Sequence, residues 1–129
     1  MKTAYNTLLA AFLVLSCGCA SLQPDGPYKG DKVLYNADVA ITTAYDVLHR
    51  FVTWEYENRA ALAPWPEIKR AADQVRLNSP GLINSAITLR ETYAATKTSA
   101  ARDSLSTVIA LLRASMLEAV KYITEHPTP

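Results

Sequence analysis

The segment from Asp31 to Ala63 restricts the fold more than any other part of the sequence, because its apolar residues have helical periodicity. They recur at alternating steps of three and four residues, which places them along one side of an α-helix (Leu34, Ala37, Ile41, Ala44, Leu48 and Phe51). Asp31 is a favourable N-cap residue, and Pro64 disfavours helical geometry at the residue before it. We therefore predict a helix from Asp31 to about Ala63 with one face turned toward other helices.

Two later stretches have the same periodicity. The first runs from Pro66 to Thr96 and contains an interruption, since Ser79 can cap a new helix that has Pro80 in its first turn. The second begins at Thr98 or Ser99 and ends before Pro127. Its apolar stripe contains Leu105, Val108, Ile109, Leu112, Met116, Ala119 and Ile123.

These three stretches are similar in length and have short connections, a pattern typical of antiparallel helices in a bundle. We predict an all-α fold, an up-down-up three-helix bundle over residues 31–126 whose middle helix is broken near Ser79-Pro80. Residues 127–129 are expected to form a short tail.

The first twenty residues predict export from the cytoplasm. Lys2 precedes an unbroken apolar run from Leu8 to Leu15, and small residues follow from Ser16 to Ala20. A positive start, a short apolar core and a small-residue exit are typical of a secretory signal peptide. The apolar run is much shorter than the roughly 20 residues that a membrane-spanning helix needs.

The end of this segment, Val14-Leu15-Ser16-Cys17-Gly18-Cys19, resembles the lipobox of bacterial lipoproteins. The resemblance implies a signal peptide over residues 1–18, cleaved before Cys17 or before Cys19, with a diacylglycerol on the new N-terminal cysteine. The first alternative has the better residue at −3 (Val14), and the second has the better residue at −1 (Gly18). Ordinary cleavage after Ala20 would instead release a soluble secreted protein, and an uncleaved anchor is the third possibility.

Residues 19–30 contain two prolines and two glycines and predict a flexible tether between the lipid and the bundle. Neither cysteine is followed by Asp, the residue that favours inner-membrane retention in the enterobacterial lipoproteins that this start resembles. We therefore expect a lipid-anchored protein of the bacterial cell envelope, on the outer membrane.

Composition and motifs argue against several classes of function. The 13 basic and 12 acidic residues nearly balance, which argues against a nucleic-acid-binding surface. His49 and His126 lack further ligands at metal-binding spacing, and no catalytic triad is recognisable, so we expect no metal, no cofactor and no enzyme activity. Glu55 and Glu57 are expected to be solvated charges.

Aromatic residues are the remaining candidates for a contact site. Trp65 lies between Pro64 and Pro66 at the corner that connects the first two helices, and Trp54 and Tyr56 lie nearby in the sequence. Trp65 could also fold back on the core beside Trp54. The expected role is structural or protein-docking, with an envelope protein as partner. The alternatives are a phage- or plasmid-type surface-exclusion, immunity or lysis-accessory lipoprotein, or a soluble helical binding protein.

Overall fold

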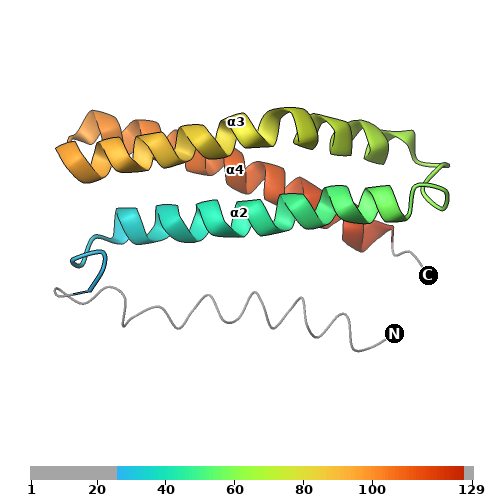
Figure 1. Cartoon of the computed structure of the whole chain (residues 1–129), viewed down its shortest axis with the longest axis horizontal. Coiled ribbons are helices and arrows are strands. Elements are labelled where there is room, and N and C mark those ends of the chain that lie inside the picture. Colours follow the sequence, from blue (N-terminus) through green and yellow to red (C-terminus); the bar gives the residue numbers. More distant parts are fainter. Residues whose placement is uncertain (1–25, 127–129) are drawn as a thin grey trace. The chain divides into compact units, whose positions relative to one another are not determined.

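The computed structural model describes residues 26–126, which contain three α-helices and no strand. These are α2 (Lys32–Glu57), α3 (Pro66–Thr96) and α4 (Ser99–Glu125). The chain divides into two compact units, residues 1–35 and 36–129, and the second contains nearly all of the three helices. Within it, successive helices run in opposite directions, and the α2–α3 corner lies at the same end as the end of α4 (Figure 1). The predicted all-α three-helix bundle is confirmed.

In the unit that ends at Tyr35, the start of α2 is fixed by a side-chain cap. Asp31 Oδ1 accepts hydrogen bonds from the amides of Val33 at 2.9 Å and Leu34 at 3.1 Å, as expected for an N-cap residue. Two consecutive turns precede the cap, and Gly30 takes a positive φ of 75° there. The signal peptide, Cys17, Cys19, the first residues of the tether and the tail 127–129 lie outside the described residues.

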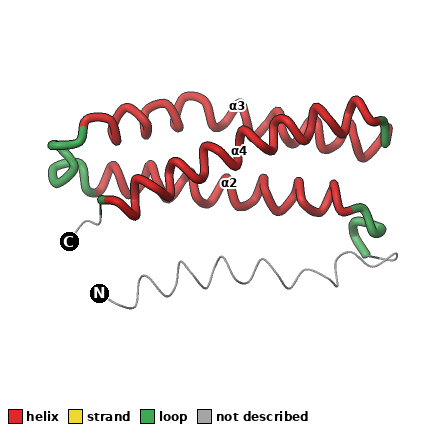
Figure 2. The backbone as a smooth tube through the Cα atoms, turned by 180° about the vertical axis from the view of Figure 1, so that it is seen from behind, coloured by secondary structure: helices red, strands yellow, loops and turns green. Residues whose placement is uncertain are grey.

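Helix α2 ends at Glu57, six residues before the predicted end at Ala63. The carbonyl of Trp54 accepts two hydrogen bonds from Asn58, one from its main-chain amide at 3.1 Å and one from its side-chain amide at 2.8 Å, so Asn58 holds the last turn of the helix. Residues 58–64 then form a series of turns rather than a continued helix (Figure 2). The prediction was wrong here because it relied on Pro64 alone as the terminator.

Helix α3 is continuous through Pro80, so the predicted break near Ser79-Pro80 is wrong. Proline removes one helical hydrogen bond and crowds the preceding turn, but it does not oblige a helix to end. The buried residues of α3 lie on both sides of Pro80, and their packing holds both halves in one helix (Ile68, Ala72, Ala86 and Tyr93). No residue of α3 between Ala72 and Ala86 is fully buried, so its middle is the least packed part.

The turn between α3 and α4 needs only two residues. Lys97 adopts a left-handed conformation with φ of 53°, and its amide donates a 2.9 Å hydrogen bond to the Tyr93 carbonyl. Thr98 then caps α4, with its hydroxyl accepting from the amide of Ala101 at 3.3 Å. The predicted start of the last helix is therefore confirmed, with Thr98 as the cap.

The three helices do not pack equally closely. Many Cα atoms of α3 and α4 approach within 8 Å of each other, whereas α2 has almost no such approach to either helix. Longer side chains from α2 cross the wider gap, including Leu48 and Phe51, which are almost fully buried. The apolar core of residues 36–126 consists of Ala37, Ala40, Ala44, Leu48, Phe51, Leu62, Ile68, Ala72, Ala86, Tyr93, Ala101, Leu105, Ile109, Leu112 and Ala119.

Candidate functional site

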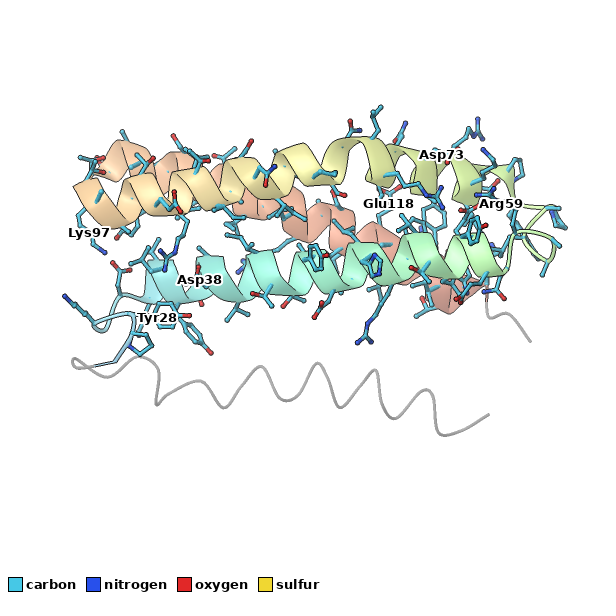
Figure 3. The ribbon with its side chains drawn as sticks, in the orientation of Figure 1. Tyr28, Asp38, Arg59, Asp73, Lys97 and Glu118 are labelled. Atoms are coloured by element: carbon cyan, nitrogen blue, oxygen red, sulfur yellow. The ribbon has the colours of Figure 1, made fainter. Side chains whose placement is uncertain are left out.

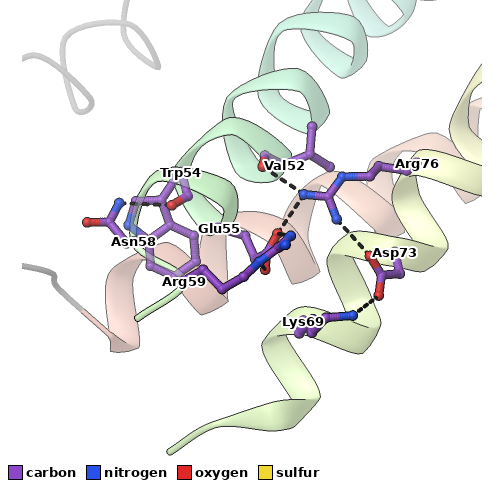
Figure 4. A network of polar contacts seen from close by, with 8 residues as sticks. All are labelled: Val52, Trp54, Glu55, Asn58, Arg59, Lys69, Asp73 and Arg76. Carbon is purple, nitrogen blue, oxygen red and sulfur yellow. Dashed lines mark hydrogen bonds and ion pairs between the residues drawn. The ribbon is translucent and has the colours of Figure 1, made fainter. Parts of the chain in front are cut away.

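The most elaborate polar arrangement in the described chain lies near the α2–α3 corner, and we call it the corner cluster (Glu55, Arg59, Lys69, Asp73 and Arg76; Figure 4). Glu55 is its centre and is only 1% exposed. One carboxylate oxygen accepts from Arg59 at 3.0 Å, and the other accepts from Arg76 of α3 at 2.5 Å and from Arg59 at 3.1 Å. Arg76 thereby connects the two helices.

Arg76 has further partners that fix its position. Its guanidinium donates to the main-chain carbonyl of Val52 at 3.1 Å and to Asp73 at 2.8 Å. Asp73 in turn receives a 2.7 Å bond from Lys69. A chain of alternating charges therefore runs from the buried Glu55 to the surface of α3.

The protonation of Glu55 reflects two opposing influences. Burial by itself would raise the pKa of Glu55, but the hydrogen bonds and charges of Arg59 and Arg76 outweigh it and hold the pKa below its ordinary value of 4.5. The pKa of Asp73 is lowered as well, chiefly by the hydrogen bond from Lys69. Both carboxyl groups, Glu55 and Asp73, are therefore ionised at neutral pH.

The expectation that Glu55 is a solvated charge is wrong, because its side chain is buried and paired with Arg59. The sequence contains a signal that points to the burial. Leu48, Phe51 and Glu55 continue the three- and four-residue steps of the apolar stripe, so Glu55 occupies a core position. A carboxylate at such a position needs cationic partners, and Arg59 follows four residues later in the sequence.

A second ion pair joins α2 to α3 away from the corner. Asp38 accepts two parallel 2.9 Å hydrogen bonds from the guanidinium of Arg90. Their side chains are 29% and 30% exposed, so solvent reaches this pair. Asp38 lies toward the start of α2, whereas Arg59 and Asp73 lie toward the corner (Figure 3).

The structure separates the three aromatic residues that were predicted as contacts. Trp65 is 40% exposed and meets the ring of His126 edge-on, with 4.9 Å between ring centroids. Tyr56 is 69% exposed, and the guanidinium of Arg59 lies over its ring at 5.4 Å. Both residues flank the turn segment 58–64, and Trp65 contacts the end of α4.

Trp54 belongs to a different environment. It is half-buried, and its ring stacks on Phe51 with 6.0 Å between centroids. Phe51 also stacks on Tyr122 of α4 at 5.9 Å. Trp54 is therefore continuous with the core, while Trp65 and Tyr56 present aromatic surface to the outside.

Between residues 26 and 126, no group of three or more His, Cys, Asp or Glu side chains could hold a metal ion. Within the same residues, no helix is both long and apolar enough to cross a membrane. The comparisons with known proteins returned no matching family, no matching characterised protein and no matching solved structure.

Proposed function

We propose that this protein is a lipid-anchored lipoprotein of the bacterial cell envelope whose helical bundle has a structural or protein-docking role. The observation that carries the proposal is the sequence Val14-Leu15-Ser16-Cys17-Gly18-Cys19 after a short apolar run. Each buried acyl CH₂ contributes about 0.8 kcal/mol of membrane affinity, and two acyl chains anchor a protein stably. An anchored bundle needs no membrane-binding surface of its own.

The corner end of the bundle is the best candidate for contact with an envelope protein. Trp65 is held between two prolines and remains 40% exposed beside His126. Aromatic residues on rigid turns are frequent interface anchors, because they bury a large area and lose little conformational entropy on binding. The corner cluster fixes the adjacent ends of α2 and α3 and so supports the presentation of Trp65 and Tyr56.

Acylation is tested with labelled palmitate in cells that express the full chain. The wild-type protein should incorporate the label and sediment with membranes, while the Cys17→Ser, Cys19→Ser double variant should lose both properties. The two single variants decide which cysteine carries the lipid. An unlabelled wild type, or a double variant that stays on membranes, would exclude the lipoprotein proposal.

The acylation test excludes one of the two alternative functions but not the other. A phage- or plasmid-type surface-exclusion, immunity or lysis-accessory lipoprotein would also be acylated, and its gene would lie among phage or conjugation genes. A soluble secreted helical binding protein would be unlabelled and would appear in the soluble fraction. Genes for envelope machinery beside this one would favour the docking role.

A further inference from the structure

A groove of about 290 Å³ lies between α2 and α3, at the middle of the bundle. Val52 from α2 and Val75 and Ile83 from α3 contribute apolar walls, and Tyr45 and His49 of α2 also line it. A cavity of about 150 Å³ already accommodates benzene. The groove is therefore large enough for a molecule of two fused rings.

The groove is a consequence of how α2 and α3 are joined. Their backbones stay apart along their length, and two ion pairs span the gap, Glu55 with Arg76 and Asp38 with Arg90. Where α3 lines the groove it contributes Ser79 and Pro80, and none of its residues between Ala72 and Ala86 is fully buried. The space is thus bounded by an ion pair at each end.

One wall of the groove offers a hydrogen-bond acceptor. In a regular helix the amide of residue 80 would donate to the carbonyl of residue 76, but proline has no amide hydrogen. Pro80 therefore leaves the Arg76 carbonyl without its helical donor, and both residues line the groove. A main-chain carbonyl that lacks its helical donor favours a ligand that supplies one N–H or O–H group.

The rim favours a flat and uncharged ligand. Tyr45 is 62% exposed, and its ring is stacked almost parallel to that of His49, with an interplanar angle of 16°. This ring pair offers a planar surface for stacking. The Arg76 guanidinium is already bound by Glu55, Asp73 and the Val52 carbonyl, so it does not favour an anionic ligand.

We propose that the α2–α3 groove is a binding site for a small, flat, uncharged aromatic molecule with one N–H or O–H donor. The ring lies against Tyr45 and the apolar walls, and its donor bonds the Arg76 carbonyl. This site does not involve the lipid anchor or Trp65, and it shares Arg76 with the corner cluster.

The test compares indole with 1-methylindole, which has the same ring system but lacks the N–H. Amide chemical shifts of the ¹⁵N-labelled full chain report each titration. The wild type should show saturable shifts at groove residues and should bind indole roughly fivefold more tightly, as one net hydrogen bond implies. A purely hydrophobic groove would instead favour the more apolar 1-methylindole.

Two neighbouring variants distinguish the specific loss of the Arg76 carbonyl as an acceptor from a non-specific effect of mutating α3. Pro80→Ala restores the amide donor to the Arg76 carbonyl and should remove the preference for indole. Gly81→Ala adds a methyl group into open space and leaves the carbonyl available, so its preference should match the wild type. The proposal is overturned if the wild type shows no saturable shifts at the groove, if it binds 1-methylindole at least as well, or if Pro80→Ala retains the preference.

Discussion

The two ion-paired connections between α2 and α3 use the same chemistry in different surroundings. Each joins an acidic residue of α2 to an arginine of α3, Glu55 to Arg76 and Asp38 to Arg90. The Glu55 side chain is 1% exposed, whereas Asp38 is 29% exposed. Buried charges depend strongly on their partners, while exposed pairs are screened by solvent and contribute little.

The difference indicates that the two ends of the α2–α3 contact are not equally rigid. At the corner, the buried Glu55 carboxylate requires both Arg59 and Arg76 to stay in place. The chain around it therefore has few alternative conformations. At the Asp38 end, either side chain can return to water at small cost. The corner is therefore the better support for a contact surface, and it is the end that carries Trp65.

The largest loss of stability is expected from a substitution in the core, which destabilises the whole bundle and therefore both ends of the α2–α3 contact. Leu112 of α4 is fully buried, and Leu112→Asp would bury an unpaired charge. The cost should be on the order of several kcal/mol, comparable with the whole stability of a domain, so thermal unfolding should shift strongly or the chain should fail to fold. Leu111→Asp is the matched control, because Leu111 is 52% exposed and should tolerate the charge. Similar melting curves for the two variants would contradict the assigned core.

The comparison between the two connections is tested by making the same substitution in each. Arg76→Gln removes one of the two cations that hold the buried Glu55 and should destabilise the fold by about 2 kcal/mol, as expected for a lost hydrogen bond to a buried charged group. Arg90→Gln breaks the half-exposed pair and should cost less than about 1 kcal/mol. Urea unfolding at pH 7 measures both values. Equal losses would mean that burial does not distinguish the two sites.

A smaller effect should appear in the dependence of stability on pH. The pKa of Glu55 is lower in the folded chain than its ordinary value of 4.5, so the unfolded chain takes up the proton first. The free energy of unfolding should therefore fall as the pH drops below about 4.5 and through the folded-state pKa. Urea unfolding between pH 7 and pH 3 should show a shallower fall for Glu55→Gln than for the wild type. Parallel curves for the two proteins would remove Glu55 as a cause of acid sensitivity.

The helices and their inward faces follow from the sequence because periodicity determines which residues share a side. Leu48, Phe51 and Leu112 were predicted to face the core and are buried there. The continuity of α3 through Pro80 was not predictable from local signals, because it depends on packing on both sides of the proline. The spacing between α2 and α3, and hence the groove, also depends on contacts between residues far apart in the sequence, such as Asp38 and Arg90.

The proposed docking end is tested most directly by site-specific photo-crosslinking in living cells of the organism that encodes the protein. Trp65→p-benzoylphenylalanine places a photoreactive ring at the corner, and Leu77→p-benzoylphenylalanine places the same ring at an 80% exposed control position on α3. Our account predicts one discrete protein adduct from position 65, none of that mass from position 77, and loss of the adduct when Cys17 and Cys19 are both replaced by Ser. No adduct from position 65, or the same adduct from position 77, would contradict it.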